Sequence, residues 1–125
     1  MIPVISTVAY GTGEHEGQSF NINADIAAAK IAAAMNAEKL LLMTDVRGIL
    51  RNVDDPDSLI KELSRSELDA LKKDGIVNKG MIPKVDCCIM ALDGGVKKAH
   101  IIDGRIPHVL LSELFTDEGV GTVIF

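Results

Sequence analysis

The sequence contains few aromatic residues and no tryptophan. Aromatic side chains account for 3% of its 125 residues, whereas 47% of the residues are hydrophobic. A chain of this composition has enough aliphatic Ala, Val, Ile and Leu to bury a core, which excludes an intrinsically disordered protein and is typical of α/β domains. The length fits one domain.

Long apolar runs and an excess of positive charge are also missing. No uninterrupted apolar stretch reaches the roughly 18 residues that cross a membrane, and the N-terminus does not have the pattern of a secretory signal. We therefore expect a soluble, cytoplasmic protein with no membrane partner. The net charge of −5 argues against a nucleic-acid partner held by a basic face.

Cysteine is scarce, and its position makes a disulfide unfavourable. The two cysteines, Cys87 and Cys88, are adjacent in the sequence. A bond between them would be strained and would close no useful loop, so we expect two reduced thiols.

The hydrophobic pattern predicts strands that alternate with helices. Apolar runs predict strands at 2–8, 39–45, 99–103 and 121–125, and the turn at 52–58 suggests a small hairpin. Helices are expected at 26–35, from the capping box at Ser64 to just before Gly75, at 82–92 and from Pro107 onward. This alternation predicts a three-layer α/β sandwich around a mainly parallel sheet, with 39–45 as a central parallel strand.

Polar residues at the start of the alanine-rich helix form the first candidate site. The segment Asn21-Ile22-Asn23-Ala24-Asp25 precedes an almost wholly apolar helix. The first turn of a helix offers free N–H donors and a partial positive charge, which suits an anionic ligand. Capping needs only one of the three polar side chains, so this segment is either an N-cap with two neighbours or part of an anion site.

The end of the 39–45 strand is the second candidate site. In open α/β sheets, ligands bind beyond the carboxyl ends of the strands, which is where Thr44 and Asp45 lie. Asp45 is also an ordinary turn residue, and local sequence leaves both interpretations open.

Four blocks of the sequence occur in an order that is typical of a known enzyme family. They are Asn-Ile-Asn-Ala-Asp at 21–25, Leu-Leu-Met-Thr-Asp-Val-Arg-Gly-Ile-Leu at 41–50, Gly-Met-Ile-Pro-Lys-Val at 80–85, and Ile-Ile-Asp-Gly-Arg at 101–105 followed by Thr-Asp-Glu-Gly-Val-Gly-Thr at 116–122. With these blocks the chain resembles N-acetylglutamate kinase, of the amino acid kinase superfamily. The resemblance covers nearly the whole chain but only the carboxyl-terminal half of such an enzyme.

The resemblance implies a fold and a partner. Residues 1–125 would form the ATP-binding lobe, with the carbamate kinase-like fold of the superfamily. The amino-terminal lobe, which carries most of the acceptor pocket and the dimer interface, would be absent or supplied by a complementing chain, and this chain would be inactive alone. In a photosynthetic eukaryote the resemblance implies the plastid stroma as the location.

The resemblance also implies an activity, which is transfer of the ATP γ-phosphoryl group to the side-chain carboxylate of N-acetyl-L-glutamate in arginine biosynthesis. A carboxylate nucleophile is already ionised at neutral pH, so cations and oriented donors are needed rather than a general base. By the match, Lys84 offsets the charge of the transferring group and Asp25 orients the catalytic lysines. Asn21 would contact acetylglutamate, and Asn23 would support it locally.

The same match assigns the nucleotide contacts. Mg²⁺ in this family is held largely by the nucleotide phosphates, so no metal ligand is expected from the chain. The ATP-binding residues implied by the match are Asp45, Val46, Gly48, Ile49, Leu50, Ile76, Val77, Asn78 and Gly80.

The carboxyl-terminal block resembles that of arginine-inhibited members of the family. It implies an arginine effector region at His108, Glu118, Gly119 and Gly121. Two residues depart from the family pattern. Lys79 stands where a glycine is usual, and Asn36 replaces a glycine after the alanine helix, which a left-handed conformation would tolerate.

Two alternatives remain at the level of sequence. The chain is either the nucleotide lobe of an acetylglutamate kinase or a non-catalytic module that binds nucleotide or regulates. A related alternative is the ATP lobe of another amino acid kinase, of the glutamate 5-kinase or carbamate kinase type.

Overall fold

A four-stranded sheet forms the centre of the protein in a computed structural model, which describes residues 1–77, 80–116 and 119–125. The strand order is β3-β5-β6-β4, in which β3 pairs with β5 and β4 with β6 in parallel, while β5 and β6 are antiparallel. The strands are β3 (Lys39–Thr44), β4 (Glu62–Leu63), β5 (Lys98–Asp103) and β6 (Gly121–Ile124). The expected α/β sandwich around a mixed, mainly parallel sheet is confirmed.

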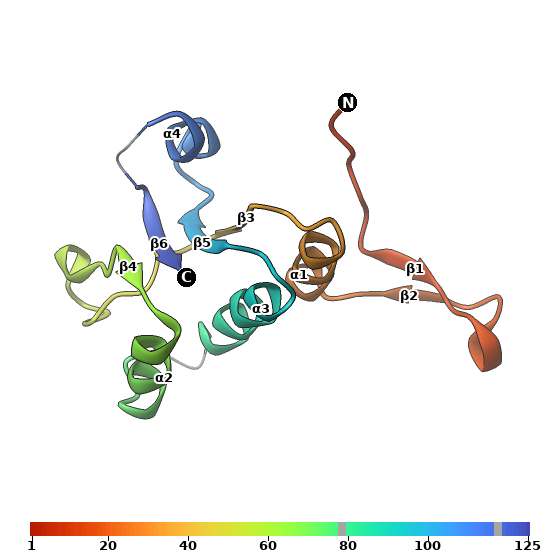
Figure 1. The fold of residues 1–125 in the computed structure, drawn as a ribbon, viewed down its shortest axis with the longest axis horizontal. Coiled ribbons are helices and arrows are strands. Elements are labelled where there is room, and N and C mark those ends of the chain that lie inside the picture. Colours follow the sequence, from red (N-terminus) through yellow and green to blue (C-terminus); the bar gives the residue numbers. More distant parts are fainter. Residues whose placement is uncertain (78–79, 117–118) are drawn as a thin grey trace.

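Helices cover both faces of this sheet. Figure 1 shows α1 and α3 side by side on one face and α4 on the other. The helices are α1 (Ala24–Ala34), α2 (Arg65–Lys73), α3 (Ile82–Asp93) and α4 (Val109–Phe115), and two short 3-10 helices are η1 (Gly13–His15) and η2 (Pro56–Ser58). In the described parts of the chain, no helix is long and apolar enough to span a membrane.

Alternation along the strands divides their side chains between the two faces. In β3, Leu40 and Leu42 are buried in the main core, whereas Met43 is half exposed on the opposite face. The main core lies under α1 and α3. Small side chains let these two helices approach closely, because a Cβ added to Gly94 at the end of α3 would lie only 2.4 Å from Cβ of Ala33 in α1. The alanine-rich composition of α1 therefore serves close packing.

Local signals at helix ends are confirmed. The Ser64 hydroxyl oxygen accepts a hydrogen bond from the Glu67 amide, and the Glu67 carboxylate accepts one from the Ser64 amide. These two bonds form the predicted capping box of α2. Asn36 adopts a left-handed conformation, with φ of 50°, the conformation expected to tolerate asparagine at this position. Both cysteines are free, as expected, and both are buried in α3.

Three expectations about the strands are wrong in part. Residues 2–5 form no strand and are exposed, and the first strand, β1 (Val8–Tyr10), pairs with β2 (Ser19–Asn21) in a separate hairpin. Figure 1 shows this hairpin extending away from the four-stranded sheet. β3 is parallel to its neighbour but lies at an edge of the sheet rather than at its centre, and the hairpin around 52–58 is reduced to one bridge between Leu50 and Leu59.

Candidate functional site

An ion pair joins the first turns of α1 and α3. Asn23 caps α1 by accepting a hydrogen bond from the Ile26 amide at 3.1 Å, and Asp25 follows in the first turn. Lys84 lies in the first turn of α3, and its Nζ is 3.2 Å from Oδ2 of Asp25. The side chains are 25% and 29% exposed, so solvent and ligands can reach the pair.

The two asparagines of the predicted acceptor contact have different local roles. Asn23 is the N-cap of α1, which accounts for its presence without a ligand. Asn21 ends β2, where its Oδ1 accepts a hydrogen bond of 3.4 Å from the Thr7 hydroxyl. Asn21 is exposed, and its predicted contact with an acceptor stays a prediction.

An apolar pocket brings together most of the residues predicted to bind a nucleotide. One wall is the segment after β3 and the other is the segment before α3, so the pocket lies beside the helix that carries Lys84. Its lining residues are Val46, Gly48, Ile49, Leu50, Val53, Ile76, Val77 and Met81. Apolar walls suit the face of a planar base, and the neighbouring helix N-terminus suits an anion.

The backbone at Gly48 requires glycine. Its φ is 144°, which side chains of other residues rarely permit, and an added Cβ would lie 2.6 Å from Oγ1 of Thr122 and 2.9 Å from Cδ1 of Leu59. The chain can turn from β3 into the pocket wall only because this residue has no side chain.

Charged side chains gather at the carboxyl ends of β3 and β5. Thr44 and Asp103 end these paired strands opposite each other, and Arg105 holds the Asp103 carboxylate with two hydrogen bonds of 2.9 and 2.8 Å. The hydrogen bonds from Arg105 lower the pKa of Asp103 to about 2. Asp45 is exposed next to this cluster and also attracts the Arg105 guanidinium. The sequence predicts Asp45 at this edge of the sheet but indicates no role for Asp103 or Arg105.

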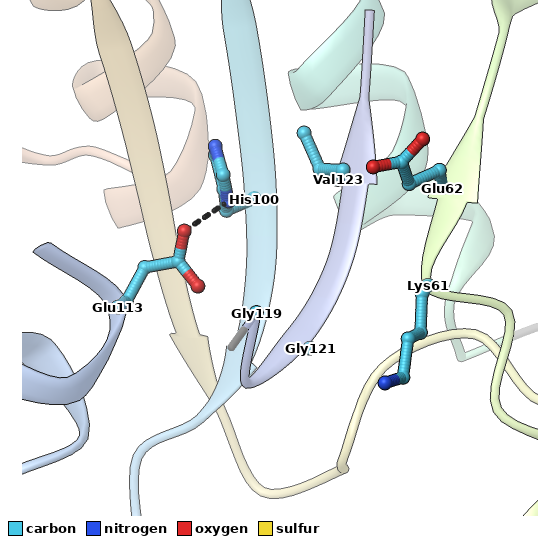
Figure 2. A pocket seen from close by; sticks show the side chains of 7 residues that line it. All are labelled: Lys61, Glu62, His100, Glu113, Gly119, Gly121 and Val123. Carbon is cyan, nitrogen blue, oxygen red and sulfur yellow. Dashed lines mark ion pairs between the residues drawn. The ribbon is translucent and has the colours of Figure 1, made fainter. Parts of the chain in front are cut away.

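A second pocket lies on the α4 side of the sheet. It is lined by Lys61, Glu62, His100, Glu113, Gly119, Gly121 and Val123. Figure 2 shows His100 of β5 and Glu113 of α4 pointing toward each other, with Nδ1 2.8 Å from Oε1. Burial lowers the pKa of His100, although the Glu113 carboxylate opposes this shift. Its Nε2 is buried and has no hydrogen-bond partner among the described residues.

The predicted effector residues are only partly brought together. Gly119 and Gly121 line this second pocket, whereas His108 lies at the start of α4 in a different hollow, beside Met43. The predicted residues Asn78 and Glu118, and the unusual Lys79, lie outside the described residues. Sequence reasoning missed His100 and Glu113; a histidine inside an otherwise apolar strand is the signal that could have revealed them.

The described residues were also compared with the needs of a metal site. Among residues 1–77, 80–116 and 119–125, no three His, Cys, Asp or Glu side chains are grouped so that they could hold a metal ion.

A lysine–aspartate pair at two helix N-termini lies next to an apolar pocket beyond a parallel strand of an α/β fold. Residues 1–103 match the amino acid kinase family. The chain belongs to that family.

Proteins similar to this chain are longer than it is. The acetylglutamate kinase of Synechococcus elongatus is 61% identical over 123 residues, which cover 98% of this chain and 40% of that protein. An N-acetylglutamate synthase from Neisseria gonorrhoeae, in complex with coenzyme A and L-arginine, is 36% identical with a TM-score of 0.75 over 86% of this chain and 24% of its own. A carbamate kinase from Giardia lamblia bound to AMP-PNP is 28% identical with a TM-score of 0.66, over 86% and 38% of the two chains. The chain thus spans about 40% of the length of the acetylglutamate kinases that it matches.

Proposed function

We propose that this chain is the nucleotide-binding lobe of an acetylglutamate kinase. The complete enzyme transfers the γ-phosphoryl group of ATP to the side-chain carboxylate of N-acetyl-L-glutamate. The observation that carries the proposal is the identity of 61% to an acetylglutamate kinase, which extends over 98% of this chain and therefore over every residue of the site. An amino-terminal lobe, or a chain that replaces it, is the required partner.

The chemistry accounts for the residues at the two helix N-termini. An oxygen of the acceptor carboxylate forms a bond to the γ-phosphorus while the bond from that phosphorus to the ADP oxygen breaks, and no proton is transferred. Lys84 lies near the transferring group and offsets its negative charge. Asp25 holds Lys84 in position through the 3.2 Å contact. Asn21 contacts the acceptor and Asn23 supports that segment.

The apolar pocket takes the adenine. Its walls, at Gly48–Leu50 and Ile76–Val77, bind the base by apolar contact, and Asp45 faces the ribose or phosphates. Gly80 allows the chain to approach the phosphates ahead of α3. Mg²⁺ supplies charge neutralisation when it is bound with the nucleotide, and its ligands are mainly phosphate oxygens.

Calorimetry and an activity assay test the proposal together. ATP binding is measured on this chain alone, and acyl-phosphate formation is measured with acetylglutamate, first on the chain and then with a separately supplied amino-terminal lobe. We expect binding without turnover for the chain and turnover after complementation. Turnover by the isolated chain would refute its incompleteness.

The same assay distinguishes the alternatives. A non-catalytic module would bind ATP but give no acyl phosphate after complementation. The ATP lobe of a glutamate 5-kinase or a carbamate kinase would turn over glutamate or carbamate in place of acetylglutamate.

Arginine is the proposed effector of the complete enzyme. Two carboxylates, Glu62 and Glu113, line the second pocket beside Gly119 and Gly121, and carboxylates are suitable partners for a guanidinium group. The similar synthase from Neisseria gonorrhoeae binds L-arginine. Arginine is expected to lower the activity of the complemented enzyme, and no response at millimolar arginine would refute this role.

A further inference from the structure

Thr122 in β6 is fully buried and ties two other segments to its strand. Its Oγ1 accepts a hydrogen bond from the Ile49 amide at 2.8 Å, and its hydroxyl donates to the Ile60 carbonyl at 2.7 Å. Thr122 is 0% exposed, so water does not compete for either bond. A single hydroxyl group therefore satisfies one buried donor and one buried acceptor.

Ile49 and Ile60 are the two ends of one folded segment. The Ile60 amide donates to the Ile49 carbonyl at 2.9 Å, and Leu50 and Leu59 form a bridge just beyond. With the two bonds of Thr122, this backbone bond closes a hydrogen-bonded ring of three residues, Ile49, Thr122 and Ile60. Without the hydroxyl, the Ile49 amide and the Ile60 carbonyl each lose a partner in the interior.

This ring lies directly behind the apolar pocket. Gly48, Ile49 and Leu50 form one pocket wall, and Gly48 packs so closely on Thr122 that a Cβ would lie 2.6 Å from Oγ1. Thr122 itself is not among the described residues that line the pocket. Any effect of Thr122 on a bound nucleotide must pass through the wall that it holds.

We propose that Thr122 is a positioning residue for nucleotide binding, which acts by fixing the Gly48–Leu50 wall through the Ile49 amide and the Ile60 carbonyl. This inference rests on the proposed ATP site in the apolar pocket. Valine has nearly the shape of threonine but neither donates nor accepts, so Thr122→Val removes the two bonds with little change in volume. Serine keeps the hydroxyl and loses only the methyl group.

Nucleotide binding to the intact 125-residue chain tests the inference. ATP with Mg²⁺ is titrated calorimetrically into the native protein, Thr122→Val, Thr122→Ser and Val109→Ala. Val109 is buried in α4 on the other face of the sheet, so its truncation controls for lost stability alone. We expect Thr122→Val to weaken ATP binding by roughly tenfold, which lies within the range that loss of its two neutral hydrogen bonds allows. Thr122→Ser should stay within about threefold of the native affinity, and Val109→Ala should bind ATP as the native protein does.

Amide hydrogen exchange gives a second, local measurement. The Ile49 amide is expected to exchange faster in Thr122→Val and to keep its protection in Thr122→Ser and Val109→Ala. If Thr122→Val does not fold, Thr122→Cys replaces it, because a thiol hydrogen-bonds only weakly. This variant is expected to bind ATP with an affinity between those of the native protein and the valine variant.

The outcomes separate this inference from the proposed function. If the native chain binds ATP and Thr122→Val binds it equally well, Thr122 is not a positioning residue, and the ATP site stands. If Thr122→Val and Val109→Ala weaken binding equally, the effect is general destabilisation and the inference is also wrong. If the native chain does not bind ATP, the ATP site and this inference both fail.

Discussion

The ion pair between Lys84 and Asp25 allows a prediction that needs no ligand. Two unit charges separated by 3.2 Å attract each other by about 5 kcal/mol at an effective dielectric constant of about 20. Both side chains are about one quarter exposed, so desolvation and side-chain ordering offset most of this attraction. A net contribution of about 1–2 kcal/mol to the free energy of unfolding remains.

The perturbation is a double-mutant cycle with Lys84→Met and Asp25→Asn. Each single variant should lower the free energy of unfolding by about 1–2 kcal/mol, and the double variant by less than the sum, with a coupling energy of about 1 kcal/mol. Urea unfolding followed by circular dichroism measures all four proteins. Lys30→Met is the matched control, because Lys30 is an exposed lysine on α1, and its variant should stay within about 0.5 kcal/mol of the native protein.

The same two variants test the proposed catalytic role in the complemented enzyme. Loss of a cation at developing negative charge lowers the rate by about 10²–10³. Lys84→Met should therefore lower kcat by this factor with a small effect on the KM for ATP, and Asp25→Asn should lower kcat less. Additive stability effects would show that the two side chains are not coupled, and an undiminished kcat in Lys84→Met would refute its contact with the transferring group.

Three further predictions concern other parts of the site and the core. Hydrogen bonds from Arg105 hold the pKa of Asp103 at about 2, so the ionised carboxylate stabilises the fold at neutral pH. This contribution is lost as the pH falls from 3.8 toward 2. Arg105→Met should raise the pKa of Asp103, as measured by NMR titration of its carboxyl carbon. Gly48→Ala should lower the free energy of unfolding by about 1–3 kcal/mol because of its φ of 144°, and an unchanged Tm would contradict that backbone geometry. Burial raises the pKa of the Cys87 thiol, and it raises the pKa of Cys88 to about 12. Both thiols should therefore resist iodoacetamide at pH 8 and react only in urea, as measured by mass spectrometry.

Elements governed by neighbouring residues could be predicted from the sequence. Three examples depend only on side chains a few residues apart in the sequence. They are the capping box of Ser64 and Glu67, the N-cap of α1 and the apolar run of β3. Periodicity was a weaker guide to which face is buried. In α3, for example, Ile82 is exposed, whereas Cys88 is fully buried.

Features that depend on distant partners could not be predicted in this way. The apolar run at 2–8 has the composition of a buried strand, but no other part of the described chain covers Ile2 or Val4. The pairing of His100 with Glu113 joins a strand to a helix that follows it, and no local pattern specifies that contact. The positions of Asp25 and Lys84 were expected from a family resemblance, since periodicity alone does not bring two helix N-termini together.

The charges at the two helix N-termini bear on the proposed division of labour between this chain and an amino-terminal lobe. Lys84 and Asp25 together carry no net charge, so the local positive potential comes mainly from the N-termini of α1 and α3, about half a unit charge each. The phosphates of a nucleotide carry several negative charges, which these partial charges do not balance. The apolar pocket can supply affinity for the base within this chain, whereas phosphoryl transfer requires further cations. If the proposed function holds, this charge balance favours a chain that binds the nucleotide base and takes further cations from an amino-terminal lobe.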